Sequence, residues 1–301
     1  MNYLSLTTEI FVRIDDFMIE FNTQIQKIQL PDISTKKRNR KSTMVLSEVM
    51  TIIILFHLSS YRNFKHFYLY YIHIYMKHYF PNLVSYNRFV ELMKQTILPM
   101  GVYLKLPKYD KVTGISFVDS TPIRVCKNKR ISRNKVFKNL ATVGKSTMGW
   151  FYGFKLHLVC NDKGDILNFV MTEANVDDRK PLIAGNLMKS VWGKLYADKG
   201  YIGKDLFNKL FVDGIQIITS IRKNMKNSLL SIEDKILLRK RSVIETINDE
   251  LKNICQVEHS RHRSPANYFA NLLAGLIAYS FFPKKPAIKY ETQFVGQMSF
   301  C

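Results

Sequence analysis

Apolar residues recur at three- and four-residue steps through the first third of the chain, and this spacing predicts α-helices. The clearest run extends from Leu4 to Leu30, with apolar side chains at Ile10, Phe11, Ile14, Phe17, Met18 and Phe21. Three more helices are expected, separated by Ser and Pro-Asn breaks, at Leu46 to Leu58, Asn63 to His78 and Ser85 to Ile97. We therefore predict an all-helical N-terminal domain over residues 1–110.

Beyond residue 113 the pattern changes from helical spacing to strands. A short strand-like run, Ile115 to Val118, stops at Asp119. Phe154 to Cys160 then alternates between two faces, and an Asn-Asp-Lys-Gly turn connects it to a second run, Ile166 to Met171. The turn chemistry predicts a β-hairpin.

Helices and strands alternate after the hairpin. The expected elements are, in order, a helix from Arg179 to Ser190, a strand from Lys194 to Ala197, a helix from Lys204 to Phe211, a strand from Ile215 to Thr219 and a helix from Ile232 to Ile254. The strand after the first of these helices again stops at an acid, Asp198. A last apolar stretch, Tyr268 to Phe282, is too short to span a membrane and predicts a buried helix. The predicted fold class is α/β, with a second domain over residues 111–285 and a C-terminal tail over residues 286–301.

The charge of the chain favours a polyanionic partner. Its 45 Lys and Arg residues against 24 Asp and Glu residues give a formal net charge of +21 at pH 7. Such a field attracts phosphate backbones and makes binding depend strongly on salt. A basic run, Lys36 to Lys41, is expected to be a solvated linker or an arm that touches DNA. Charge alone equally allows a basic protein that binds RNA in bulk.

The cysteines and the helical domain leave several functions open. Cys126, Cys160, Cys255 and Cys301 form no Cys-x-x-Cys pair, which indicates a reduced cytoplasmic protein without a zinc knuckle. The N-terminal helices suit either a helix-turn-helix reader of DNA or ordinary structural packing. Cations that could reach phosphates from these helices are Arg62, Lys65, Lys77 and Arg88.

Three carboxylates are placed for metal chemistry. Asp119 and Asp198 each follow a predicted strand, and Glu245 lies on a helix face that also carries Arg241 and Lys252. Ligands of open α/β sheets gather at the carboxyl edges of strands, and hard divalent cations prefer carboxylate oxygen. Two Mg²⁺ ions roughly 3.5–4 Å apart stabilise the charge that develops during phosphodiester cleavage. The pattern therefore predicts metal-dependent chemistry on nucleic acid.

Each acid also has a structural interpretation. The first can cap a turn with the Ser-Thr pair that follows it, and the second can belong to an ordinary strand exit. Glu245 can form a surface ion pair with Arg241, and Asp249, one turn later, competes for the third position. The joint placement of the three acids favours the metal site.

These segments resemble the DDE transposases of bacterial insertion sequences, specifically the insertion-sequence family numbered 982. The resemblance covers roughly residues 45–285, and the matching segments are Val118 to Pro122, Gly149 to His157, Ala197 to Tyr201, and Arg241 to Glu245 followed by Leu251-Lys252. The broader signature has a tyrosine three residues before the arginine, where this chain has Leu238.

The resemblance implies a ribonuclease-H-like mixed sheet flanked by helices. It also implies Mg²⁺-dependent cleavage at transposon ends by two ions, with Mn²⁺ able to substitute, and transfer of the freed 3′ ends to target DNA. Asp119, Asp198 and Glu245 become catalytic metal ligands, while Arg241 and Lys252 become phosphate contacts. The implied setting is the bacterial cytoplasm near the nucleoid, without a membrane, and the implied assembly is a homo-oligomer on DNA.

Further contacts with DNA are expected from basic residues around these motifs. They are Lys155, Lys199, Arg124 and Lys145. His157 shares the polar face of its strand with Lys155, either as an auxiliary group or as a structural histidine. Two alternative functions remain, a metal-dependent nuclease without strand transfer and a DNA-binding protein without catalysis.

Overall fold

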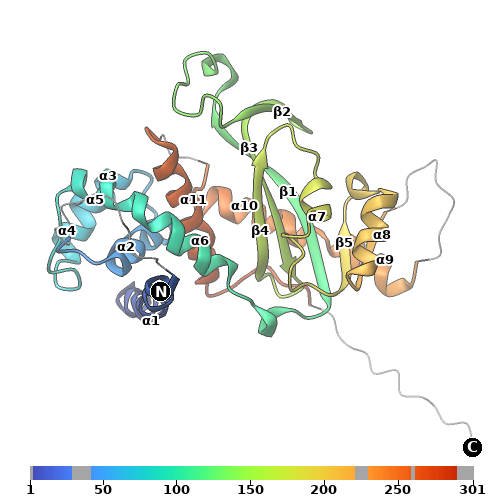
Figure 1. Cartoon of the computed structure of the whole chain (residues 1–301), viewed down its shortest axis with the longest axis horizontal. Coiled ribbons are helices and arrows are strands. Elements are labelled where there is room, and N and C mark those ends of the chain that lie inside the picture. The colour runs from blue at the N-terminus through green and yellow to red at the C-terminus, as the bar shows by residue number, and fades with distance from the viewer. Residues whose placement is uncertain (1–2, 29–41, 221–229, 259–261, 290–301) are drawn as a thin grey trace, which may run out of the picture.

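A helical region and a curled six-stranded sheet occupy opposite ends of the molecule (Figure 1). The structure is a computed structural model that describes residues 3–28, 42–220, 230–258 and 262–289. The sheet is mixed and flanked by helices, so the predicted ribonuclease-H-like α/β fold with a helical N-terminal region is confirmed. The predicted basic run Lys36 to Lys41 lies outside the described residues.

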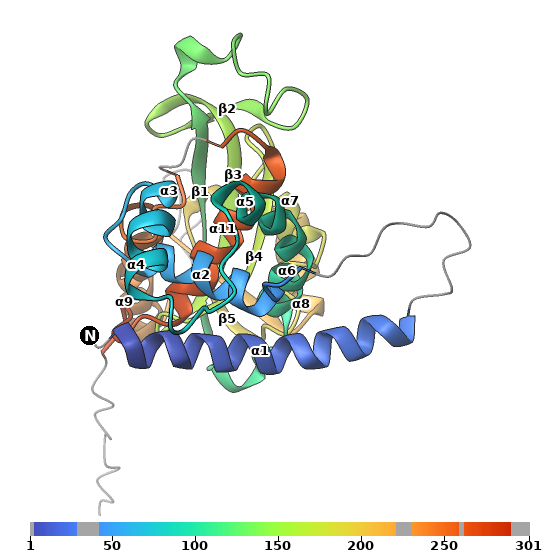
Figure 2. The ribbon, with the colours of Figure 1, turned by 90° about the vertical axis from the view of Figure 1, so that its left-hand side faces the viewer.

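The N-terminal region consists of packed helices, as the apolar spacing predicts. They are α1 Tyr3–Ile28, α2 Leu46–Leu58, α3 Phe64–His66, α4 His73–Tyr75, α5 Tyr86–Met93 and α6 Ile97–Lys105, with a π-helical stretch Phe67–Ile72 and a 3-10 turn Lys94–Thr96. The helix α1 runs along the base of this region (Figure 2). The C-terminal helix α11, Pro265–Ser280, packs on α2 and α6. In the described part of the chain, no helix is long and apolar enough to cross a membrane.

The sheet has the strand order β2-β3-β1-β5-β6, and β4 also pairs with β3. The strands are β1 Ile115–Cys126, β2 Thr142–Ser146, β3 Gly149–Asn161, β4 Ile166–Glu173, β5 Gly193–Ala197 and β6 Ile215–Thr219. The strands β1 to β4 pair antiparallel, whereas β5 is parallel to both β1 and β6. The predicted hairpin is the β3–β4 pair, and the predicted strands before Asp198 and at Ile215 are β5 and β6.

Alternating side chains of the strands fill two cores, one on each face of the sheet. Phe117 and Tyr196 belong to the core that contains the apolar residues of α10 (Ser242–Asn253) and α11. Val118 and Leu195, the adjacent residues on the same strands, belong to the core beneath α8 (Lys204–Val212). The helix α10 therefore lies on one face of the sheet, against β1, and α8 lies on the other face.

Several predicted boundaries are wrong, since the helix expected over Asn63 to His78 ends at Tyr75 and the strand expected from Phe154 begins at Gly149. The first strand does not stop at Asp119, because β3 offers an antiparallel partner that carries β1 on to Cys126. The predicted helix Arg179 to Ser190 is only the four residues of α7, Lys180–Ile183, which ends before Gly185 in the left-handed conformation (φ 79°).

The predicted helix Ile232 to Ile254 is also divided. It consists of α9, Ile232–Lys240, and α10, which meet at Arg241. The two halves pack on different neighbours, because α9 contacts β5 and β6 whereas α10 contacts β1. The bend at Arg241 lets the chain follow both.

Candidate active site

The pairing of β1 with β5 brings Asp119 and Asp198 to the same edge of the sheet. The last parallel pair is Phe117 with Tyr196, and each acid lies two residues beyond it. The rings of Phe117 and Tyr196 stack with centroids 5.4 Å apart on the face covered by α10. A strand repeats its side-chain direction every second residue, so both acids belong to that face.

Asp119 lies under α10 and is held by Asn248 of this helix and by Arg241, the residue that precedes it. The Asn248 side-chain amide donates to Asp119 Oδ2 at 3.1 Å, and Arg241 Nη1 lies 3.9 Å from Oδ1. Burial, together with the charges of Glu245 and Asp198, raises the pKa of Asp119 to about 6 in spite of Arg241. The carboxylate is therefore incompletely neutralised.

Asp198 follows the last residue of β5 and begins a 3-10 turn, Lys199–Tyr201. Its Oδ1 accepts the backbone N–H of Lys199 at 2.7 Å. The same turn buries Tyr201 beside the site, where burial and then the charges of Asp119 and Asp178 raise its pKa well above the ordinary value. The sequence motif contained Tyr201 but gave it no role.

Glu245 is linked to Asp119 through Arg241. Arg241 Nη2 lies 2.7 Å from Glu245 Oε1, and the same guanidinium reaches toward Asp119. Glu245 remains 56 % exposed, so its carboxylate is open to solvent. Asp249, the competing acid, accepts a hydrogen bond from Asn253 at 2.6 Å. The choice of Glu245 as third acid stays a prediction, supported by its position next to Arg241.

Asn248 is the site residue whose role the sequence missed. Its place on the Arg241 stripe of the helix was visible, since residues seven apart share a face. Its partner was not, because a contact with Asp119 joins positions that are far apart in the chain.

The expected auxiliary residues of β3 have partners away from the acids. Lys155 Nζ donates to the carbonyl of Val176 and to Asp178 Oδ1, both at 2.9 Å. His157 is fully buried, its Nε2 lies 2.9 Å from Thr172 Oγ1, and burial lowers its pKa to about 4. This favours the structural interpretation of His157, and a DNA contact from Lys155 stays a prediction.

Lys252 and Arg124 lie together beside the acids. Lys252 Nζ is 3.8 Å from Glu258 Oε2, and Glu258 Oε1 accepts the backbone N–H of Arg124 at 2.8 Å. Burial lowers the pKa of Lys252, whereas the charges of Glu258 and Asp119 act to raise it. The Arg124 side chain is exposed. Both cations border the site without filling it.

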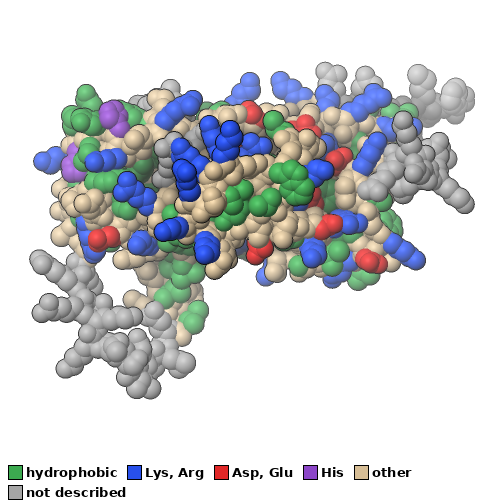
Figure 3. All heavy atoms as spheres, turned by 90° about the horizontal axis from the view of Figure 1, so that it is seen from above, with side chains coloured by type: hydrophobic (Ala, Val, Ile, Leu, Met, Phe, Trp, Pro, Cys, Tyr) green, Lys and Arg blue, Asp and Glu red, His purple; other side chains and the backbone are tan. Residues whose placement is uncertain are grey.

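A basic arm, residues 124–150, projects from the sheet next to this edge (Figure 1). No acidic residue occurs between Asp119 and Asp162 in the sequence. All the arm's cations are exposed, namely Arg124, Lys127, Lys129, Arg130, Arg133, Lys135, Lys138 and Lys145. Viewed from the side of the arm, Lys and Arg side chains gather near the centre of the surface (Figure 3). The acids therefore border a surface that attracts polyanions.

The three acids offer carboxylate oxygen, the ligand atom that hard divalent cations prefer. Within the described ranges, no three His, Cys, Asp or Glu side chains converge closely enough to hold one ion. The guanidinium of Arg241 is the cation that joins Asp119 to Glu245 in this arrangement.

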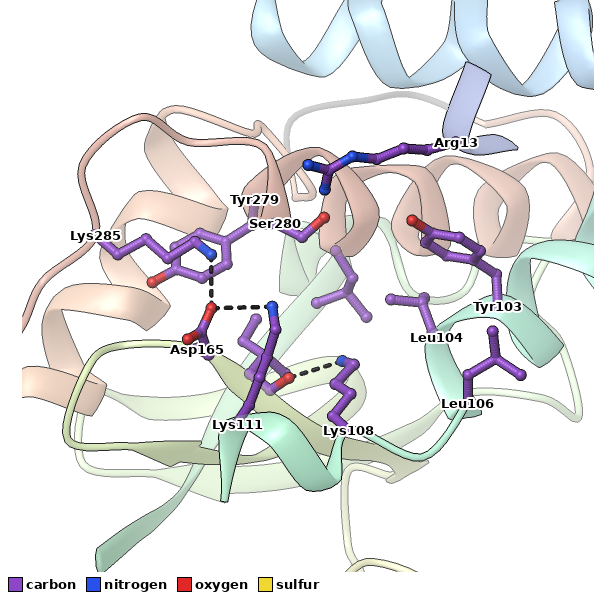
Figure 4. Close-up of a pocket in the computed structure, with 12 residues that line it drawn as sticks. Arg13, Tyr103, Leu104, Leu106, Lys108, Lys111, Asp165, Tyr279, Ser280 and Lys285 are labelled. Atoms are coloured by element: carbon purple, nitrogen blue, oxygen red, sulfur yellow. Dashed lines mark hydrogen bonds and ion pairs between the residues drawn. The ribbon is translucent and has the colours of Figure 1, made fainter. Parts of the chain in front are cut away.

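A separate cavity of about 220 Å³ lies beside the β3–β4 turn (Figure 4). Asp165, in the β3–β4 turn, lies 2.6 Å from Lys285 Nζ and 3.3 Å from Lys111 Nζ. Lys108 Nζ donates to the carbonyl of Ile166 at 2.7 Å. Since α1, α6 and α11 also line this cavity, these contacts join the helical region to the sheet.

Comparison with protein-family models gives a match. A family model described as a transposase DDE domain matches residues 109–265. The matched span is more than half of the chain and contains all six strands, the basic arm and the three acids. No curated protein matches the chain.

Proposed function

The chain belongs to the transposases with a DDE domain, and we propose that it cleaves phosphodiester bonds at insertion-sequence ends and joins the 3′ ends to target DNA. The observation that carries the proposal is the acid edge. Asp119 and Asp198 lie two residues beyond the last β1–β5 pair, and Arg241 links Asp119 to Glu245. An enzyme of this family acts on DNA, which agrees with the basic arm beside the acids.

Asp119, Asp198 and Glu245 are the groups that would hold divalent metal, expected to be two Mg²⁺ ions with Mn²⁺ as a substitute. When bound, the ions would stabilise the charge that develops on the entering and leaving oxygens of the phosphodiester. The protein itself contributes a buried, incompletely neutralised carboxylate whose partners, Asn248 and Arg241, fix its orientation.

The cations around the acids would hold the DNA backbone. Arg241 and Lys252 lie on the α10 face next to Asp119, and their charges suit phosphate oxygens. Arg124, Lys145 and Lys199 extend this basic surface around the acid edge. In this proposal the arm holds DNA through its charge, so binding weakens steeply with salt.

The remaining parts of the proposal concern recognition and assembly. The helical domain, residues 1–110, would bind transposon ends, and the catalytic domain would cover residues 111–285, followed by a tail. The protein would act as a homo-oligomer on bacterial DNA in the cytoplasm. The finer placement in the insertion-sequence family numbered 982 rests on the four sequence motifs and on the spacing of Arg241, Glu245 and Lys252.

Two matched alanine variants test the third acid. Glu245→Ala should abolish Mg²⁺-dependent cleavage of labelled transposon ends while leaving DNA binding nearly unchanged, because the Glu245 carboxylate adds no positive charge to the DNA surface. Asp249→Ala is the control, one helical turn away, and should retain cleavage. Loss of cleavage in Asp249→Ala alone would transfer the role to Asp249.

The joining step separates a transposase from a nuclease on the same scaffold. Pre-cleaved, labelled ends are incubated with the protein, Mg²⁺ and a supercoiled plasmid. A transposase yields plasmid that carries the label, whereas a nuclease yields only shortened fragments. Binding without either product, in protein with all three acids intact, would indicate a DNA-binding protein without catalysis.

A further inference from the structure

The tip of the basic arm exposes large apolar side chains. Trp150 is 61 % exposed and Met148 is 84 % exposed, at the turn between β2 and β3. Val143 of β2, opposite Tyr152 in the ladder, is 44 % exposed. A tryptophan that leaves most of its ring in water gives up a large burial energy, and such residues gather where a partner binds.

Trp150 is held in place before any partner arrives. The β2–β3 ladder pairs Lys145 with Trp150, and the Asn128 side-chain amide donates to the Trp150 carbonyl at 2.9 Å. In the turn, the Met148 N–H donates to Ser146 Oγ at 3.3 Å. The backbone that carries the Trp150 ring is therefore already ordered in the hairpin, which lowers the entropy cost of binding.

The base of this hairpin is fixed against the sheet. A Cβ on Gly144 would lie 2.1 Å from the carbonyl oxygen of Ala174, so only glycine lets β2 approach the end of β4 so closely. Thr142 Oγ1 also donates to the Asn175 side-chain oxygen at 3.1 Å. The arm therefore keeps a defined direction relative to the acid edge.

The groups around the Trp150 ring indicate which kind of partner it binds. Lys145 Nζ lies over the Trp150 ring, 5.8 Å from its centroid, and the arm carries exposed cations without an acid. Aromatic rings interleaved with cations bind nucleic acid by stacking on bases while the cations follow the backbone. Stacking of this kind needs a base that has left the duplex, since paired bases already stack on one another.

We propose that Trp150 is a stacking platform for an unpaired base of DNA bound along the basic arm, with Lys145 holding the adjacent phosphate. This rests on the proposed function, because the DNA it concerns is the substrate of the acid edge. Leu158 is the partner of Asp119 in the ladder, and Trp150 lies eight residues before Leu158 in β3 (158 − 150 = 8). At a strand rise of about 3.3 Å per residue the separation is roughly 26 Å. DNA that runs alongside β3 would therefore place the unpaired base about eight nucleotides from the cleaved bond, at about 3.4 Å per nucleotide.

The protein offers a direct optical test, because Trp150 and Trp192 are its two tryptophans. Trp192 packs against Gly114 at the start of β1, away from the arm. In full-length Trp192→Phe protein, Trp150 is the single indole reporter. We expect a duplex with an unpaired bubble about eight nucleotides from the scissile position to quench its fluorescence, and a fully paired duplex of the same sequence to quench it much less.

Affinity measurements give a second, independent reading. Trp150→Ala should weaken binding to the bubble duplex about 10-fold more than binding to the paired duplex, and Trp150→Phe should restore most of the difference. Lys145→Ala should weaken both duplexes equally and reduce the salt dependence. Circular dichroism of each variant checks that the fold is intact.

Several outcomes would overturn the inference. Equal losses for the two duplexes in Trp150→Ala, or bubbles at every position quenching alike, would reduce Trp150 to an ordinary surface residue. If binding to anionic vesicles depends on Trp150, the tip is a membrane contact. If self-association without DNA, measured by sedimentation, depends on Trp150, the tip is a contact with a second copy of the chain. In each case cleavage and joining by the wild type would leave the proposed function standing. If the wild-type protein binds neither duplex, both this inference and the proposed function are wrong.

Discussion

Asp119 lies at the carboxyl end of the β1–β5 pair, whereas Asp165 lies in the β3–β4 turn near the other end of that pair, and the two carboxylates differ in how far nearby cations balance their charge. Both are largely buried and both have cations nearby. Asp165 lies 2.6 Å from Lys285 and 3.3 Å from Lys111. Burial acts to raise its pKa, but the hydrogen bond and charge of Lys285, together with Lys111, hold it below the ordinary value.

Asp119 shows the opposite balance. Its cation, Arg241, is 3.9 Å away and lies closer to Glu245, and the charges of Glu245 and Asp198 act against ionisation. Burial dominates, so the pKa rises to about 6. The end with Asp165 is therefore a neutralised joint between the helical region and the sheet, whereas burial at the other end leaves Asp119 with a raised pKa, and such shifts are common at functional sites.

The largest expected effect is on activity at the acid end. Asp119→Asn should lower Mg²⁺-dependent cleavage by about 10³-fold or more, because the amide keeps the shape but cannot carry the charge that holds a cation. The assay is the rate of end cleavage per folded molecule. Asp165→Asn is the matched control at the other end and should retain the wild-type rate. Equal losses in the two variants would refute the distinction between the ends.

The second effect is on stability at the joint. Asp165→Asn should lower the free energy of unfolding by about 2 kcal/mol, because it leaves Lys111 and Lys285 near each other without a carboxylate. Urea denaturation measures it. Asp119→Asn should not lower stability in the same titration, since the amide relieves the cost of a buried charge. A stable Asp165→Asn protein would show that the ion pairs do not support the joint.

Local sequence signals predicted those parts of the fold and the site that depend on local chemistry. The β3–β4 hairpin could be predicted from its alternating side chains and its turn residues. The ends of β6 and α2 could likewise be predicted without knowing any residue distant in the chain. The acids were proposed because Asp198 follows a strand closely and because Arg241 and Glu245 are four residues apart, a spacing that brings helical side chains together, and their role stays a prediction.

The parts that were not predicted depend on distant contacts. The length of β1 is set by its ladder with β3, and the bend at Arg241 by the two neighbours of α9 and α10. The link between Asn248 and Asp119 and the cluster of Lys111, Asp165 and Lys285 join residues without any spacing signal. The exposure of Trp150 likewise could not be predicted from the sequence, because it depends on how β2 pairs with β3.

The smallest expected effect is a difference in pH dependence between the two ends. The folded-state pKa of Asp119 lies near 6, above its ordinary value of 3.8, so its ionised form costs stability above pH 6 and protonation recovers it as the pH falls. Lowering the pH from about 7.5 to about 5 should therefore stabilise the wild type relative to Asp119→Asn by about 1 kcal/mol.

Asp165 has a lowered pKa, so its stabilisation is present above its ordinary value of 3.8 and is lost only as the pH falls through the folded-state pKa. The stability difference between wild type and Asp165→Asn should stay constant over the same range. Urea titrations of the three proteins at both pH values measure these differences, and a constant difference for Asp119→Asn would mean that its carboxylate is neutralised after all.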